Sequence, residues 1–269
     1  MHVNYEYLLN FIRANYQAHA KSLDYGCGGG EIVSAGLQEC LEISGVEAFY
    51  EGGSTKTNIE ELGLLNSSVK ELKDDHIDFP DSYFDLIVNN QVLEHVEDLA
   101  LVLSEMSRVL IPGGKVLCLF PSKEVWREGH CGIPFLHWFP KNSRARIYYA
   151  YILRTFGMGY HKKDKTKMEW VRSFCNWLDN YKYYRTKPEI VDTFQKSSMN
   201  ITFCEYDYVL FRLKHNNSKL YPFFRRMAKV DLFVWVIRKL MHKLVGMVFI
   251  AEKYHCKRAE NSNPPRFSS

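Results

Sequence analysis

A run of glycines directly follows a short apolar segment that ends in an acid. The run is Gly26-Cys27-Gly28-Gly29-Gly30, and Asp24 precedes it by two residues. Glycine has no Cβ, so the backbone of such a run can approach a ligand closely. This spacing predicts a cofactor cradle between a strand and the helix that follows it.

The charge around the run limits which cofactor it can hold. A dinucleotide fingerprint requires a third glycine, but Glu31 stands in that place. Glu31 would also open the next helix, where its carboxylate would repel a pyrophosphate. Residues 1–120 hold 7 Lys and Arg against 19 Asp and Glu, and such acidic surroundings favour a cationic cofactor. We therefore expect a sulfonium cofactor that carries an amino group.

The cradle must be positioned by the elements around it. Apolar runs of strand length alternate with segments of helical spacing between residues 22 and 120, which predicts a doubly wound parallel sheet. Strands are expected at residues 22–25, 41–47, 69–72, 83–89, 115–120, 201–213 and 247–252. Helices are expected at residues 5–18, 31–39, 57–64, 98–110 and 221–244. The predicted fold class is a Rossmann-like α/β fold with a mainly parallel seven-stranded sheet.

Composition divides the chain into four parts. These are a cofactor-binding core at residues 1–120, a helical basic and aromatic lid at 121–200, closing strands with a cap helix at 201–255, and a polar tail at 256–269 that is expected to be flexible. The apolar stretch 230–251 is interrupted by charges, so it does not resemble a membrane-spanning helix. A packed cap helix is favoured there over a basic helix lying on an anionic membrane, which stays as the alternative.

Several segments resemble, in order, the motifs of class I S-adenosylmethionine-dependent methyltransferases. They are residues 23–30 (LDYGCGGG), 45–47 (GVE), 79–88 (FPDSYFDLIV), 89–98 (NNQVLEHVED) and 110–114 (LIPGG). Together they extend over residues 22–120. The resemblance implies a Rossmann-like fold, S-adenosylmethionine as the cofactor and methyl transfer as the reaction.

The resemblance also implies which residues hold the cofactor. They are Asp24, Gly26, Cys27, Gly28, Glu47, Asp74, Asn90 and Gln91. Glu47 is expected to hold the ribose hydroxyls, and Glu51 is its rival if the second strand lies further along the chain. The chain departs from the family at the acid that meets the adenine amino group, because Lys73 stands in its place; Asp74 or Asp75 is expected to substitute.

Methyl transfer to a hydroxyl requires that the acceptor be aligned and its proton removed. A histidine that titrates near pH 7 suits this task. The candidate catalytic residues are His130, in a loop after the fifth strand, and His95, in the motif that borders the methyl donor. His137 lies in an apolar setting and is predicted to be a packed core histidine. Catalysis by proximity alone stays open as the alternative.

Metal and disulfide chemistry are not expected. The histidines and cysteines lack the C-x-x-C or H-x-x-x-H spacing of metal sites, and the adjacent Glu94 and His95 would point apart on a helix. The seven scattered cysteines favour reduced thiols. No basic apolar leader opens the chain, so we expect a cytoplasmic protein.

The acceptor is predicted from the second half of the chain, where residues 121–269 hold 28 Lys and Arg against 12 acids. The Asn90-Gln91-x-x-Glu94-His95 pattern resembles small-molecule O-methyltransferases, and a basic, aromatic lid suits a small anionic or glycosidic acceptor. RNA methylation through the basic lid is the first alternative. The second is a non-catalytic module for assembly or lipid docking. A merely solvated basic surface, with aromatic residues packing the lid, also fits the composition.

Overall fold

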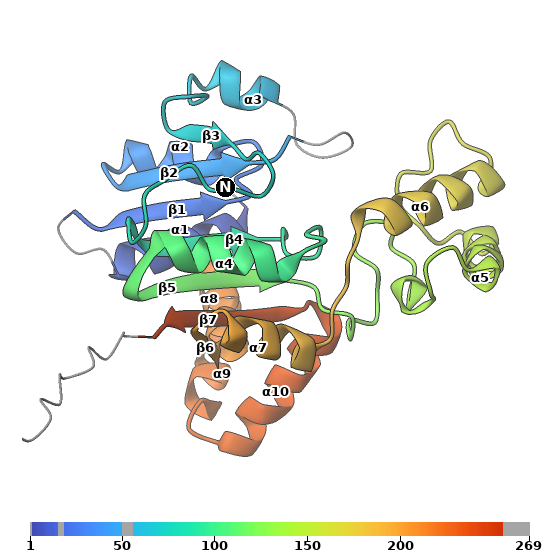
Figure 1. Cartoon of the computed structure of the whole chain (residues 1–269). Helices are drawn as coiled ribbons and strands as arrows, with labels where there is room; N and C mark the ends of the chain where they lie inside the picture. The colour runs from blue at the N-terminus through green and yellow to red at the C-terminus, as the bar shows by residue number, and fades with distance from the viewer. Residues whose placement is uncertain (1, 16–18, 50–55, 255–269) are drawn as a thin grey trace, which may run out of the picture.

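The computed structural model describes residues 2–15, 19–49 and 56–254, and its elements surround one sheet of seven strands (Figure 1). The strand order is β3-β2-β1-β4-β5-β7-β6. The strands are β1 Lys21–Tyr25, β2 Glu42–Glu47, β3 Val69–Glu71, β4 Phe84–Asn90, β5 Leu110–Phe120, β6 Met199–Phe203 and β7 Met247–Lys253. The predicted Rossmann-like fold class is confirmed.

Strand direction shows where a ligand can bind. β1 to β5 pair in parallel, and β7 pairs antiparallel with both β5 and β6. The chain builds the sheet outwards from β1 to β3 and then returns to add β4 on the other side of β1. In such sheets the crevice at the carboxyl ends of the two strands that flank this reversal is the usual ligand site. Here those strands are β1 and β4.

Helices cover both faces of the sheet, which explains why its strands are apolar on both sides. One face carries α4 Leu99–Val109 and α7 Lys187–Lys196 (Figure 1). The opposite face carries α1 Val3–Asn15, α2 Glu31–Gln38, α3 Lys56–Glu61 and α8 Glu205–His215. The predicted helix over residues 98–110 is confirmed as α4, and the Asp98 side chain caps it by accepting the Leu101 N–H at 3.0 Å.

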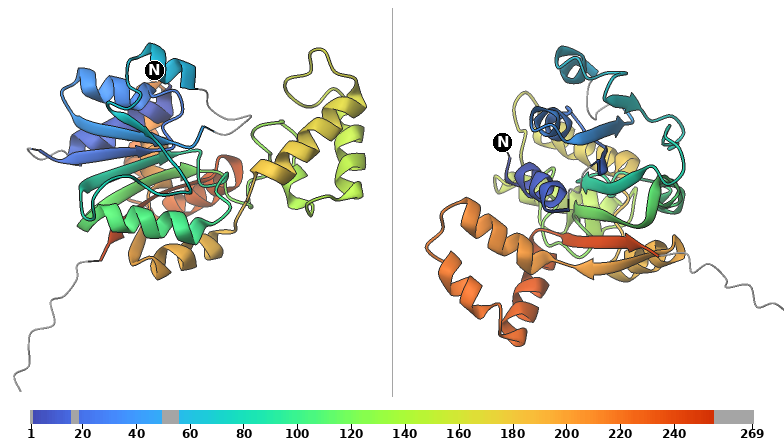
Figure 2. Two further views of the ribbon diagram at one scale, coloured as in Figure 1. Left: turned by 45° about the horizontal axis from the view of Figure 1, so that its top comes forward. Right: turned by 90° about the vertical axis from the view of Figure 1, so that its left-hand side faces the viewer.

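A lid of helices stands to one side of the sheet on a small core of its own (Figures 1 and 2). It contains the 3₁₀ turn η1 Leu136–Trp138 and the helices α5 Arg144–Thr155 and α6 Lys167–Tyr181. Trp170 is fully buried at the centre of this core. The predicted lid also included α7, but Ile190 and Phe194 bury that helix against the sheet. The part that stands apart therefore ends before α7.

The prediction of one strand over residues 201–213 is wrong beyond Phe203, because α8 begins at Glu205. Aromatic residues favour strands when a segment is considered alone. In the fold, however, Tyr208 and Phe211 are three residues apart on one helical face, and both rings pack against Tyr7 of α1, with centroids 5.0 and 5.1 Å away. Packing against α1 decides the local structure.

Two further helices follow α8 before the chain returns as β7. They are α9 Tyr221–Met227 and α10 Asp231–Leu244, which project below the sheet (Figure 1). None of the helices in the described ranges is long and apolar enough to cross a membrane. The six cysteines in those ranges are free thiols. The predicted flexible tail at 256–269 lies outside the described residues.

Candidate active site

The glycine loop starts the site at the carboxyl end of β1. The N–H groups of Gly26 and Cys27 donate to the Val46 carbonyl at 2.9 and 3.1 Å, so the loop is fixed against β2. Gly26 has φ +73°, and a Cβ there would lie 2.3 Å from a methyl group of Val92. Gly28 has φ +56° and faces open space, with no atom within 4 Å of its Cβ position. At Gly28 the loop therefore leaves space that a ligand can occupy, whereas at Gly26 the contact with Val92 leaves no space for a side chain.

Glu47 closes this loop from the end of β2. Its carboxylate accepts the Gly28 N–H at 2.7 Å and the Ala48 N–H at 3.0 Å. The side chain is only 7% exposed, and two backbone donors fix its orientation. This geometry suits the ribose-binding role predicted for Glu47. Its rival Glu51 lies outside the described residues.

Asp24 is a buried carboxylate with one oxygen that lacks a donor among the described residues. Its Oδ2 has no hydrogen-bond partner, and the side chain is 1% exposed. Burial, reinforced by the charges of Glu47 and Glu31, raises the pKa of Asp24 to about 8. Because an unpaired buried charge is unfavourable, a cationic group placed beside Asp24 would be stabilised strongly.

The predicted cofactor residues line two adjoining cavities of about 300 and 280 Å³. The first is lined by Tyr5, Asp24, Gly26, Cys27, Gly28, Ile32, Glu47, Asn90, Gln91, Val92 and His95. The two cavities share Gly26, Glu47, Val92 and His95. The structure therefore brings together every predicted cofactor residue except Asp74. Cys27 packs its side chain into the core behind the loop, where burial raises its pKa, so its backbone is the part suited to contact a ligand.

Helix α1 closes the first cavity, a contribution that its sequence pattern did not indicate. The Asn4 side-chain amide donates to Asn90 Oδ1 at 3.2 Å, the Tyr208 hydroxyl donates to Asn4 Oδ1, and Tyr5 lines the cavity. The periodicity of this segment marked only its apolar face, whereas these polar contacts depend on how α1 sits on the sheet.

Gln91, with φ +59°, is held by its N–H donating to Leu119 O at 2.7 Å.

The assignment of Asp74 to the site does not match the geometry. Residues 73–76 form a tight turn in which Asp74 and Asp75 both have positive φ, 52° and 56°. Such a turn sends consecutive side chains in different directions. Asp74 is exposed, whereas Asp75 lines the second cavity together with Leu72. Of the two acids, Asp75 is therefore the one that reaches the cavity.

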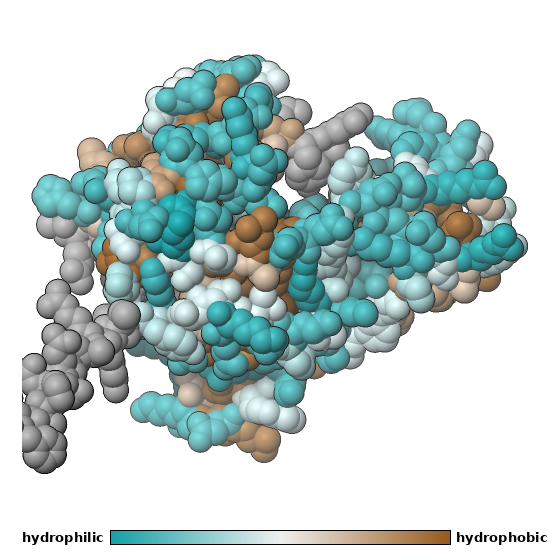
Figure 3. Space-filling view, in the orientation of Figure 1, coloured by the Kyte–Doolittle hydropathy of each residue, from teal (hydrophilic) through white to brown (hydrophobic). Residues whose placement is uncertain are grey.

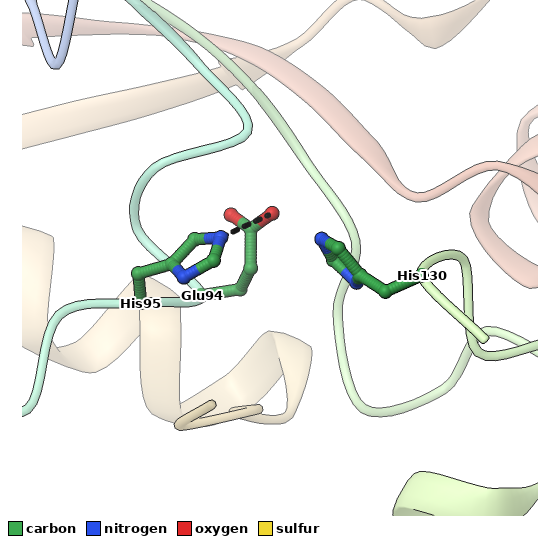
Figure 4. A group of neighbouring side chains, drawn as sticks. All are labelled: Glu94, His95 and His130. Carbon is green, nitrogen blue, oxygen red and sulfur yellow. Dashed lines mark ion pairs between the residues drawn. The ribbon is translucent and has the colours of Figure 1, made fainter. Parts of the chain in front are cut away.

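Beyond His95 the site continues into a polar cluster beneath the lid. Glu94 and His95 come from the turn after β4, and His130 approaches them from the loop after β5 (Figure 4). The side-chain nitrogen and oxygen atoms with which these three residues could hold a metal ion lie within 4.8 Å of one another. The rings of His95 and His130 meet edge to face at 5.7 Å, and Trp177 of the lid packs against both rings. The two predicted catalytic histidines are thus neighbours.

Glu128 holds His130 in place and was not predicted. Its carboxylate accepts the His130 Nδ1–H at 2.8 Å, the Tyr184 hydroxyl at 2.8 Å and the Cys131 N–H at 2.6 Å. Burial acts to raise the pKa of Glu128, but the hydrogen bond and charge of His130 hold it at about 2. Glu128 is therefore ionised, and it leaves Nε2 of His130 as the nitrogen that can accept a proton.

Lys182 is the cation of the cluster and was also missed. It is 2% exposed, its ammonium contacts His95 Nε2, and it lies 3.6 Å from Glu94 Oε1. Burial lowers the pKa of Lys182 to about 8, against the attraction of Glu94 and Glu128. Burial, with the charges of Lys182 and His130, lowers the pKa of His95 to about 3. His95 is therefore neutral throughout the physiological range.

The segment 182–185 fastens the lid to the core. The Tyr183 N–H donates to Glu94 O at 2.8 Å, and the Arg185 guanidinium donates to Val96 O at 2.9 Å and to Glu97 O at 2.6 Å. These bonds join the lid to the turn after β4. The position of the lid relative to the sheet therefore depends on this short segment.

Glu94 and His95 were predicted to point apart on a helix and so to hold no metal, but the structure contradicts that geometry. Glu94 and His95 lie in a turn rather than on a helix, so their side chains converge instead of pointing apart. The Glu94 carboxylate is 1% exposed and has no hydrogen-bond partner among the described residues, but the ammonium of Lys182 lies 3.6 Å from its Oε1. The absence of a metal stays a prediction, and Lys182 supplies a positive charge to the cluster.

A basic cavity of about 350 Å³ adjoins this cluster at the base of the lid. It is lined by Lys123, His137, Phe139, Pro140, Lys141, Arg146, Leu178, Lys182, Tyr183, Tyr184 and Arg185. Acidic side chains are lacking among these lining residues, and Arg146 Nε is buried without a partner. His137 packs on the Tyr184 ring at 4.6 Å, as expected for a buried histidine.

Comparisons with known proteins identify relatives of the sheet domain. Residues 23–118 match the model of a family described as a methyltransferase domain. Demethylmenaquinone methyltransferase of Staphylococcus aureus is 30% identical over 159 residues, which is 56% of this chain and 58% of that protein. The chain therefore covers less than two thirds of that relative's length. The crystal structure of the YcgJ protein from Bacillus subtilis shares the fold with a TM-score of 0.50 and 14% identity, covering 95% of this chain and 100% of that one.

Proposed function

We propose that this chain, whose residues 23–118 match a family described as a methyltransferase domain, transfers the methyl group of S-adenosylmethionine to a hydroxyl of a small molecule. The observation that carries the proposal is the meeting of two sites at His95. The cavities lined by the glycine loop and Glu47 end there, and the cluster of His130, Glu128 and Lys182 begins there.

The residues of the first site fit the cofactor. The unpartnered Oδ2 of Asp24 suits the ammonium of the methionine part. Glu47 suits the ribose hydroxyls, and Asp75 suits the adenine amino group. When bound, S-adenosylmethionine supplies a methyl group on a positively charged sulfur. The acidic lining of the cavity favours that charge over the anionic phosphates of a dinucleotide.

On the acceptor side, His130 is the proposed base. When the acceptor hydroxyl takes up the methyl group, its proton would pass to Nε2 of His130. Glu128 accepts the Nδ1–H and stabilises the resulting imidazolium. His95 carries Lys182 on its Nε2, so we assign it to the wall between the two sites rather than to proton transfer.

The acceptor is proposed to be anionic, either a phosphate-bearing or an acidic sugar-like molecule. The support is the basic cavity beside Tyr184 and Lys182, whose lining contributes Lys123, Lys141, Arg146 and Arg185 as well. The negatively charged groups of a substrate form their strongest hydrogen bonds with such cationic side chains. An acceptor that bridges this cavity and the cluster would present a hydroxyl to His130.

Binding and transfer can be tested separately. We expect the full chain to bind S-adenosylmethionine in calorimetry and Glu47→Ala to weaken that binding at least about tenfold, since two charge-assisted contacts are lost. Glu42→Ala, at an exposed position on the same strand, is the matched control. Equal binding by Glu47→Ala and the wild type would contradict the site. An absence of binding at millimolar cofactor would instead favour a non-catalytic module.

The acceptor class is tested by incubating the chain with methyl-labelled cofactor and either the small-molecule or the RNA fraction of a cell extract. We expect label in a small anionic product. Label in RNA, with binding that weakens steeply as salt rises, would favour the RNA alternative, for which the basic lid surface is the supporting observation.

A further inference from the structure

The pair of helices α9 and α10 exposes apolar side chains that no other described residue covers. The inner face of α10 is packed, since Phe233 meets Tyr206, Phe223 and Phe224 ring to ring. The outer face leaves large apolar side chains in solvent. They are Leu220, Phe223, Val230, Leu232, Trp235, Val236, Leu240, Leu244 and Val245, exposed by 37 to 71%. We call these residues the α9–α10 face.

The spacing of these residues places them on one side of α10. Leu232, Trp235, Val236 and Leu240 follow one another at intervals of three, one and four residues, so they form a single stripe along the helix. Apolar side chains also emerge at the lower end of the molecule over α9 and α10 (Figure 3). A helix that is apolar on both its inner and outer faces is normally buried on both. The outer face of α10 therefore indicates an unfilled contact.

The charges around the face identify the partner. Residues 218–245 contain seven Lys and Arg and one acid, Asp231. Lys239 lies within the stripe, its ammonium 5.7 Å from the Trp235 ring centre, and Arg225, Arg226 and Lys229 are exposed beside it. Apolar residues with tryptophan on a basic helix are the features of a helix that lies in the interface of an anionic bilayer.

The α9–α10 face is also tied to the edge of the sheet that carries the site. His242 Nε2 lies 3.0 Å from Ser122 Oγ and 3.3 Å from Glu124 Oε2, both in the segment after β5. The Trp126 N–H donates to Lys243 O at 2.8 Å, and the Trp126 side chain is 43% exposed. The apolar surface therefore continues from the end of α10 towards the base of the lid.

We propose that the α9–α10 face docks the chain onto an anionic lipid bilayer, with Leu232, Trp235, Val236 and Leu240 entering the interface and the surrounding Lys and Arg contacting lipid phosphates. The helices lie on the surface and do not cross it. Docking in this orientation brings the base of the lid towards the bilayer. The proposal is independent of the methyl acceptor, because it depends only on this surface.

The test is co-sedimentation of the full chain with vesicles of phosphatidylglycerol and phosphatidylcholine in equal parts, and with vesicles of phosphatidylcholine alone. We expect binding to the anionic vesicles that weakens as salt rises. Leu232→Ser with Trp235→Ser should weaken this binding about tenfold or more, because the inserted apolar area is lost. Lys229→Glu with Lys239→Glu should weaken it by about fivefold for each charge removed.

Matched control variants make the same chemical changes on the lid. Phe156→Ser removes an aromatic side chain that is 81% exposed, and Lys162→Glu with Lys163→Glu reverses two exposed charges. We expect both to bind vesicles like the wild type, with all variants checked for an unchanged thermal midpoint. Equal loss in the lid variants would overturn the proposal. So would failure of the wild type to bind vesicles, or a dimer in solution that only the α10 variants break, since a second copy would then cover the face.

Discussion

Two buried carboxylates on either side of the site show how differently its two halves are built. On the cofactor side, Asp24 has no donor for Oδ2, and its pKa is raised to about 8. On the acceptor side, Glu128 accepts three hydrogen bonds, and its pKa is held at about 2. Asp24 thus has an oxygen left for a ligand, whereas the protein itself already supplies the hydrogen bonds of Glu128. A carboxylate of the first kind binds a cation, and one of the second kind orients a neighbour.

The two halves also differ in what positions them. The cofactor cradle consists of backbone groups and side chains at neighbouring strand ends, with Val46, Glu47 and the loop joined by short-range bonds. The acceptor cluster joins side chains from three distant segments, around residues 94, 128 and 182. The cradle therefore depends on the sheet, and the cluster depends on how the lid is fastened to it.

The largest effect is expected on the acceptor side. Glu128→Gln removes the charge that orients His130 and stabilises its protonated form, so turnover should fall by about 10² to 10⁴-fold. Cofactor affinity, measured by calorimetry, should stay unchanged because Glu128 does not line the cofactor cavities. Glu60→Gln, which alters an exposed acid that lines neither cavity, is the control. Loss of cofactor affinity in Glu128→Gln would break the proposed separation of the two halves.

Asp24→Asn should have the opposite signature. Losing the charge-assisted bond to the cofactor ammonium should weaken binding about 100-fold. The ligand-free protein should become more stable, with a higher thermal midpoint at pH 8, because an uncompensated buried carboxylate is removed. Asp78→Asn, at an exposed position, controls for the change in net charge. A lower thermal midpoint in Asp24→Asn would contradict the idea that Asp24 is kept at a cost to stability for binding.

Gly26→Ala tests the backbone part of the cradle. The new Cβ would lie 2.3 Å from Val92 at φ +73°, so we expect a loss of about 2 to 4 kcal/mol in unfolding free energy from overpacking and left-handed strain combined. Gly63→Ala is the matched control, because Gly63 has φ +66° but no atom within 4 Å of its Cβ position. It should lose only about 1 to 2 kcal/mol by chemical denaturation. Equal losses would mean that contact with Val92 contributes nothing.

The same division explains what the sequence could predict. Asp24, the glycines and Glu47 stand at strand ends within about 25 residues of one another, so periodicity and turn chemistry are enough to locate them. Asp74 was assigned where Asp75 lines the cavity, because a tight turn decides which of two adjacent side chains faces inwards. Glu128 and Lys182 were missed, since each acquires its role only through contacts with residues far away in the chain. The strand predicted beyond Phe203 failed for the same reason, as α8 is stabilised by packing on α1.

Cofactor affinity should depend on pH through the ionisation of Asp24. The pKa of Asp24 is raised to about 8, so in the ligand-free protein this side chain is mostly protonated below that pH. Only its ionised form pairs with a cation. Affinity should therefore rise about tenfold per pH unit from pH 6 towards pH 8. Above that range the α-amino group of the cofactor loses its own proton, so affinity should pass through a maximum.

The stability of the ligand-free protein should change in the opposite direction. Asp24 has a higher pKa when folded than the ordinary value of 3.8, so the native state binds more protons between these two values. This group therefore lowers the unfolding free energy as pH rises from 3.8 to about 8. Asp24→Asn should flatten the rise of cofactor affinity with pH, measured by calorimetry. It should also flatten the decline of stability with pH, measured by thermal unfolding. Retention of the full rising arm in Asp24→Asn would assign the proton to another group and leave Asp24 without its proposed role.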